Sequence, residues 1–154
     1  MLAYVFWHRP ADGVDAGTYE EALRGFHAEL AAAAPTRFAG SQSFARASLP
    51  WFDGYEDWYL VADWTALGSL NAAAVAARSL PAHDAVATRA ADGAGAVFAL
   101  HAGALDLRDV RGATWSDVPA EGDALWRRQL VLGPAPQYCA HHRGGGGAIE
   151  RQIL

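Results

Sequence analysis

The sequence LAYVFWH, residues 2–8, is apolar at every position before its final histidine. Successive side chains of a strand point to opposite faces of the sheet, so this stretch presents apolar residues to both faces. A strand of this kind needs cover on each side. The stretch therefore predicts a central, fully buried strand in a sheet whose two faces are both covered.

Outward from this strand, the next periodic segment predicts a helix over residues 18–34. Apolar residues recur there at helical spacing, and Pro35 ends the run. Thr18 is the expected N-cap, followed by two acidic residues that suit the first turn. The apolar positions are Tyr19, Leu23, Phe26 and Leu30.

Two further strands are predicted over residues 41–49 and 55–64, joined by the turn PWFDG at 50–54. A hairpin centred near Trp51 places Arg46 opposite Asp57. These two charges form either a clamp for a carboxylate ligand or an ordinary cross-strand pair.

The rest of the first hundred residues predicts a second helical segment and a fourth strand. A helix is expected over 65–78, a further helical stretch over 83–90 after Pro81, and a strand over 96–102 once the sequence DGAG at 92–95 has ended the helix. The resulting β-α-β-β-α-β order is the ferredoxin-like pattern, an α+β fold with an antiparallel sheet and helices on one face. We expect this domain to span residues 1–104.

Part of the remaining sequence echoes the beginning. WHRPADG at 7–13 is matched by WSDVPAEG at 115–122 with one residue inserted, and residues 125–132 and 137–142 read as strand, turn and strand. We interpret residues 105–143 as a degenerate, truncated second repeat that adds strands and makes an α+β barrel. A generic β-extension is the alternative. Residues 144–154 begin with a glycine run and are expected to form a flexible C-terminal tail.

Composition limits the function classes. The chain has 154 residues, of which 52% are hydrophobic, and a net charge of -5. These values suit one folded unit and exclude disorder. The scattered arginines and acidic balance argue against a nucleic-acid or membrane partner. No secretory signal or membrane-length apolar run is found, and a single cysteine, Cys139, suits a reducing compartment. A cytoplasmic location is expected.

Over about residues 2–103 the chain resembles the dimeric α+β-barrel superfamily, which includes Dabb-like and EthD-like ferredoxin folds. It is also similar to uncharacterised bacterial proteins with the motifs YEDWY (55–59), PAHD (81–84) and LGPAPQYC (132–139). The resemblance implies a barrel of paired sheets, usually across a homodimer. It also implies pockets for cofactor-free monooxygenase, dehalogenation-like, isomerisation or haem-degrading chemistry. A homodimer is expected, because the second sheet face needs a partner, and the alternative is that the extra half-repeat covers this face within one chain.

In this fold the end of the first strand, the hairpin tip and the end of the second helical segment meet at one rim. We therefore predict His8, His83 and Asp84 as catalytic residues. Histidine suits a general base near neutral pH, and a carboxylate orients it. The alternative is that these are an ordinary strand end and a helix cap. The residues predicted to line a ligand pocket are Trp7, His27, Arg46, Trp51, Trp58 and Tyr59.

Two functions follow from these residues. The first is a small-molecule-binding protein, acting as a cofactor-independent enzyme on a small aromatic or carbonyl compound by histidine acid/base chemistry. The second is a non-catalytic dimerisation or binding module with no active site. No cofactor is expected, haem included. Cys139 and His141 supply too few ligands for a metal site, and none is expected.

Overall fold

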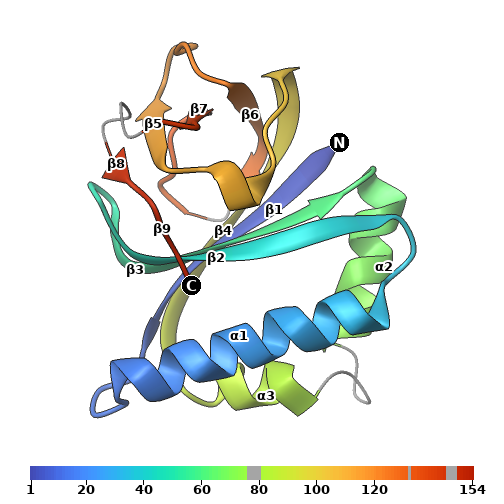
Figure 1. The fold of residues 1–154 in the computed structure, drawn as a ribbon, viewed down its shortest axis with the longest axis vertical. Coiled ribbons are helices and arrows are strands. Elements are labelled where there is room, and N and C mark those ends of the chain that lie inside the picture. Colours follow the sequence, from blue (N-terminus) through green and yellow to red (C-terminus); the bar gives the residue numbers. More distant parts are fainter. Residues whose placement is uncertain (76–80, 132, 145–148) are drawn as a thin grey trace.

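The computed structural model describes residues 1–75, 81–131, 133–144 and 149–154, with all their side chains except those of residues 46, 47, 75 and 131. Across these ranges, nine antiparallel strands form one sheet that curls into a nearly closed barrel. Three α-helices lie together on the outside of one part of it (Figure 1). The elements are β1 (Leu2–Pro10), α1 (Ala16–Ala33), β2 (Phe38–Leu49), β3 (Phe52–Val61), α2 (Trp64–Val75), α3 (Pro81–Ala87), β4 (Ala90–Gly103), β5 (Gly112–Ser116), β6 (Ala124–Val131), β7 (Tyr138–His142), β8 (Ile149–Glu150) and β9 (Gln152–Ile153).

The predicted α+β class and the β-α-β-β-α-β element order of the first hundred residues are confirmed, with the second helical segment divided into α2 and α3. The neighbour order in this part of the sheet is β4-β1-β3-β2. The predicted end of the second helix near residue 78, the strand end at 132 and the glycine run at 145–147 lie outside the described residues.

Helix α1 forms where its periodicity predicted, and its four apolar positions are buried against the sheet and its neighbours. The prediction of Thr18 as N-cap is wrong. The helix begins at Ala16, and the Asp15 side chain accepts a hydrogen bond from the backbone N–H of Thr18 at 2.9 Å. A carboxylate at this position satisfies one of the free N–H groups of the first turn, so the cap lies three residues earlier than expected.

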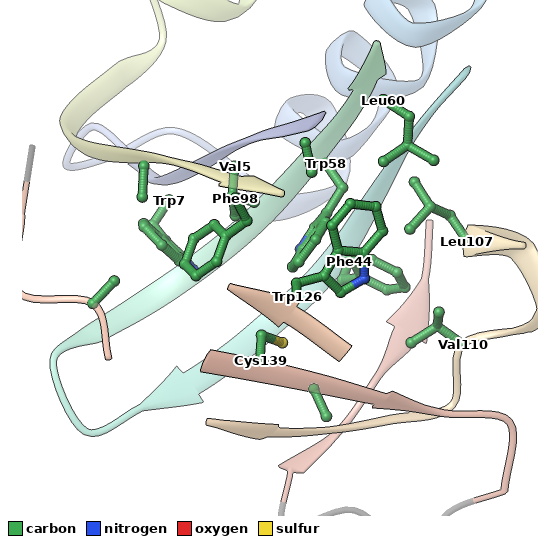
Figure 2. Packing of buried hydrophobic residues seen from close by; sticks show 14 of the residues in the cluster. Val5, Trp7, Phe44, Trp58, Leu60, Phe98, Leu107, Val110, Trp126 and Cys139 are labelled. Atoms are coloured by element: carbon green, nitrogen blue, oxygen red, sulfur yellow. The ribbon is translucent and has the colours of Figure 1, made fainter. Parts of the chain in front are cut away.

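The prediction that β1 is covered on both faces is confirmed. Ala3, Val5 and Trp7 belong to the barrel core, where Figure 2 shows Val5 and Trp7 beside Phe98. The residues on the helix side are Leu2, Tyr4, Phe6 and His8. One strand therefore forms the wall between two separate interiors, the barrel core and the space beneath the helices.

The predicted register of the β2–β3 hairpin is wrong. Leu49 pairs with Phe52, so the turn has two central residues, not five, and a bulge interrupts β2 between Phe44 and Ala47. Asp57 consequently lies opposite Ser43. Asp57 therefore does not lie opposite Arg46 as expected, because the shorter turn and the bulge shift the register of the two strands.

Strand β4 begins at Ala90, so the sequence DGAG at 92–95 lies inside the strand and does not precede it. The two glycines have a packing reason. A Cβ atom at Gly93 would lie 2.3 Å from the ring of Phe6, and one at Gly95 would lie 3.0 Å from the Tyr4 hydroxyl. Glycine here lets the aromatic side chains of β1 lie across the neighbouring strand.

The nearly closed barrel is built from one chain. Beyond β4 the sheet continues through β6, β7, β5 and β8, and β9 pairs with β2 at the opposite edge. In Figure 1 the red segment carries the chain from β5 across to β2. Residues 149–154, in the segment expected as a tail, form β8 and β9, whose backbone groups pair with β5 and β2. The second sheet face needs no partner copy to cover it.

The structure contains no helix, among its described residues, that is both long and apolar enough to cross a membrane.

Two glycines of this fold should respond oppositely to alanine. Gly103 has φ +73°, and a Cβ atom there would lie 2.1 Å from the carbonyl oxygen of Asp123. Gly25 lies exposed in α1 with open space around it. Gly103→Ala should lower the free energy of unfolding by about 2–4 kcal/mol. Gly25→Ala should raise it by about 0.5–1 kcal/mol. Urea denaturation measures both, and a Gly103→Ala protein as stable as the parent would contradict the close approach.

Candidate functional site

A pocket of about 820 Å³ lies between the three helices and the sheet. Its lining is mostly apolar and aromatic, with Phe6 and Tyr4 from β1 and Phe26 from α1. Trp64 and Leu130 also line it and are about half exposed, at 53% and 48%, which places them at its mouth. An apolar pocket with a few convergent polar groups is the usual form of a small-molecule site.

The polar groups of this pocket gather around Asp57, which is 2% exposed. Its Oδ2 accepts a hydrogen bond from the Tyr59 hydroxyl at 2.8 Å and lies 3.1 Å from Nε2 of His8. Its Oδ1 accepts a hydrogen bond from the Ser43 hydroxyl and lies 3.5 Å from Nε2 of His27. The carboxylate is therefore held by two hydroxyls and flanked by two imidazoles.

These neighbours keep Asp57 ionised. Burial by itself raises the pKa of this carboxyl, but His8 and then His27 lower it by more, and the net pKa lies far below its ordinary range. A permanent negative charge at the polar end of the pocket follows.

His8 joins this carboxylate to a tyrosine. Its Nδ1 lies 2.6 Å from the hydroxyl oxygen of Tyr19, and its ring stacks between Phe6 and Tyr55 with centroid distances of 5.5 and 5.9 Å. When the Tyr19 hydroxyl donates a hydrogen bond to Nδ1, the other ring nitrogen carries the proton that faces Asp57. The order Asp57, His8, Tyr19 then resembles the carboxylate, imidazole and hydroxyl arrangement of acid/base sites.

The two tyrosines of this cluster remain neutral. Burial, followed by the charge of Asp57, raises the pKa of both Tyr19 and Tyr59. Their hydroxyl groups therefore stay protonated and are able to donate hydrogen bonds throughout the physiological pH range.

His27 contacts the carboxylate of Asp57 from outside the pocket lining. Its ring stacks on Tyr59 at 5.3 Å and its Nδ1 lies 2.7 Å from the hydroxyl of Ser41. His27 does not line the pocket. Its contribution is to the charge and position of Asp57.

Two of the three predicted catalytic residues line the pocket. His8 and His83 both line the pocket, and the His83 ring lies 5.6 Å from that of Phe26. The side chain of Asp84 is 79% exposed, in the first turn of α3, and is not part of the lining. Nδ1 of His83 lies 3.3 Å from Oδ1 of Asp84, so Asp84 contacts one pocket histidine, whereas Asp57 is the carboxylate beside His8.

The predicted pocket residues divide between the two faces of the sheet. Tyr59 lines the pocket, whereas Trp7 and Trp58 lie inside the barrel, because consecutive residues of a strand face opposite ways. Trp51, in the turn after β2, packs against Trp7 and not against the helix side. The side chain of Arg46 lies outside the described residues.

The barrel interior holds a second polar cluster. One nitrogen of Arg151, Nη2, lies 2.9 and 3.0 Å from the two carboxylate oxygens of Glu56. The same carboxylate accepts hydrogen bonds from the indoles of Trp7 at 2.9 Å and Trp58 at 2.6 Å. Burial, then the charge of Glu56, raises the pKa of the nearby Cys139 thiol, which stays protonated and unreactive. This cluster lies inside the barrel and does not line the pocket.

Sequence reasoning missed Asp57 as the centre of the site. The available signal was a pair of acidic residues, Glu56 and Asp57, within a largely apolar strand, where a buried charge needs a partner. His8 lies near the end of the neighbouring strand, on the same face as Asp57.

No group of three or more histidine, cysteine or acidic residues in the described ranges is arranged to hold a metal ion. A scan of protein-family models and searches of curated proteins and of solved structures find no significant match to this chain.

The ionisation of Asp57 can be measured through its carboxyl ¹³C shift in NMR. Because its folded pKa is depressed, Asp57 stabilises the protein above the unfolded-state value of 3.8, and that stability is lost as the pH falls towards the folded value. His8→Gln should raise the pKa of Asp57 by roughly one unit or more. The same substitution at the exposed His101 should leave it unchanged. An Asp57 that titrates near 3.8 in the parent protein would contradict this account.

Proposed function

We propose that this protein binds a small aromatic or carbonyl compound in the pocket beneath its helices and transfers a proton on it through His8. The observation that carries the proposal is the sequence of contacts from Asp57 to His8 to Tyr19 at the polar end of an otherwise apolar pocket. The chemistry needs no cofactor.

The contacts suit a general base. When the Tyr19 oxygen takes a proton from a bound compound and passes its own proton to Nδ1 of a neutral His8, His8 becomes an imidazolium. Asp57, 3.1 Å away and already ionised, stabilises that positive charge. At present Nε2 of His8 lies at ion-pair distance without hydrogen-bond alignment. Such contacts often tighten when a ligand binds.

The pocket also suits the compound class. Tyr4, Phe6 and Phe26 offer flat apolar surfaces, and the neutral hydroxyls of Tyr19 and Tyr59 lie at the polar end. A ring that stacks on these walls, with a carbonyl or acidic C–H group turned towards the hydroxyls, satisfies both parts of the pocket.

We further propose a ferredoxin-like domain over residues 1–104, completed by a truncated repeat over 105–143. In support, β5, β7 and β6 are neighbours in the same order as β1, β3 and β2. Membership of the dimeric α+β-barrel superfamily is part of this proposal. A homodimer no longer follows from the need to cover the sheet, because the chain covers its own sheet.

5-Nitrobenzisoxazole tests the base. In this flat aromatic compound, removal of the ring C–H proton breaks the N–O bond and releases a coloured cyanophenolate, with no other reactant. The protein should accelerate the reaction, and His8→Gln should lower the second-order rate constant about 100-fold or more. His101→Gln is the matched control. Equal rates for the parent and His8→Gln proteins would exclude proton transfer by His8.

Pocket occupancy is tested separately with N-phenyl-1-naphthylamine, whose fluorescence rises in apolar sites. Val86 lines the pocket, whereas Ala32 is exposed on α1. Val86→Trp should weaken binding about tenfold or more by filling the pocket, and Ala32→Trp should not. Specific binding without His8-dependent proton transfer would assign the protein to the alternative class, a non-catalytic binding module. Equal binding by the two variants would remove the pocket as the site.

A further inference from the structure

We propose that residues 149–154, which we term the strap, position Asp57 and Tyr19 at the polar end of the pocket. No residue of the strap lines the pocket itself. The inference goes beyond the proposed function, because it concerns how the polar cluster is held, whether or not the pocket is catalytic.

The first link runs through the backbone of β2. Ile153 pairs with Phe44 in the β2–β9 ladder, and the backbone N–H of Leu154 donates to the carbonyl of Ser43 at 3.2 Å. The hydroxyl of Ser43 in turn donates to Asp57. The strap therefore fixes the edge of the strand that supplies one of the two hydroxyl partners of the carboxylate.

The second link is apolar packing. Leu154 packs against the buried cluster of Tyr19, Leu23 and Tyr55. Two members of this cluster touch His8, since Tyr19 hydrogen bonds to its Nδ1 and Tyr55 stacks on its ring. Loss of the Leu154 side chain would leave space beside these tyrosines.

The third link anchors the strap. The side chains of Arg151 and Glu56 are completely buried, and the guanidinium of Arg151 lies 5.7 Å from the ring centroid of Phe44. Glu56 precedes Asp57 on β3 and faces the barrel. Because a buried charge without its partner is strongly unfavourable, Arg151 holds the strap in one position across the barrel edge. Residues 152–154 then lie beside β2 in a defined register, and Leu154 reaches the helix side of the sheet.

The test compares Leu154→Ala with Gln152→Ala, a control in the same strap whose side chain is exposed. Two NMR readouts report on the polar cluster: solvent exchange of the side-chain protons shared by His8 and Tyr19, and the pKa of Asp57 from its carboxyl ¹³C shift. Leu154→Ala should speed the exchange about fivefold and raise that pKa towards its ordinary value, and Gln152→Ala should change neither.

A strap that only closes the barrel would give a different result. Leu154→Ala would then lower the melting temperature and leave both readouts as they are in Gln152→Ala, which would overturn the proposal. Should Leu154→Ala fail to fold, Leu154→Val provides the same comparison with a smaller loss of volume. Binding of N-phenyl-1-naphthylamine, measured on the same variants, reports separately on whether the pocket is a ligand site.

Discussion

Two successive acidic residues on β3, Glu56 and Asp57, are both buried, and their side chains point to opposite faces of the sheet. An isolated buried carboxylate is strongly unfavourable, so each must be surrounded by donors or positive charges. Glu56 finds them inside the barrel, in Arg151 and two indoles. Asp57 finds them on the helix side. The rest of the structure supplies these two sets of partners.

This requirement explains why distant parts of the chain meet at β3. Helix α1 brings Tyr19 and His27, eight residues apart and so on one helix face, to the Asp57 side, with Leu23 buried between them. The last described segment brings Arg151 to the Glu56 side across the barrel edge. Strand β3 thereby links the apolar barrel core to a pocket whose polar end carries the charge of Asp57. The proposed proton transfer depends on that charge.

Residue patterns anticipated part of the site. Three residues named from the sequence, His8, Tyr59 and His83, line the pocket. Trp7 and Trp58 were expected in the pocket because they are aromatic, but strand alternation places them in the barrel. The role of Asp57 was not anticipated, because its neighbour across the hairpin depends on turn length, and a two-residue turn changes every cross-strand partner.

Local periodicity alone determined the helix α1, the double-faced burial of β1 and the need for a second cover over the sheet, because each depends only on residues a few positions apart. The tertiary structure decided which segment provides that cover and which residues neutralise the buried charges. Arg151 meets Glu56 across 95 residues of sequence, and His8 meets Asp57 on a neighbouring strand. No periodic pattern encodes such pairs. Such pairs form because the folded chain tolerates a buried charge only where another segment places an oppositely charged partner beside it.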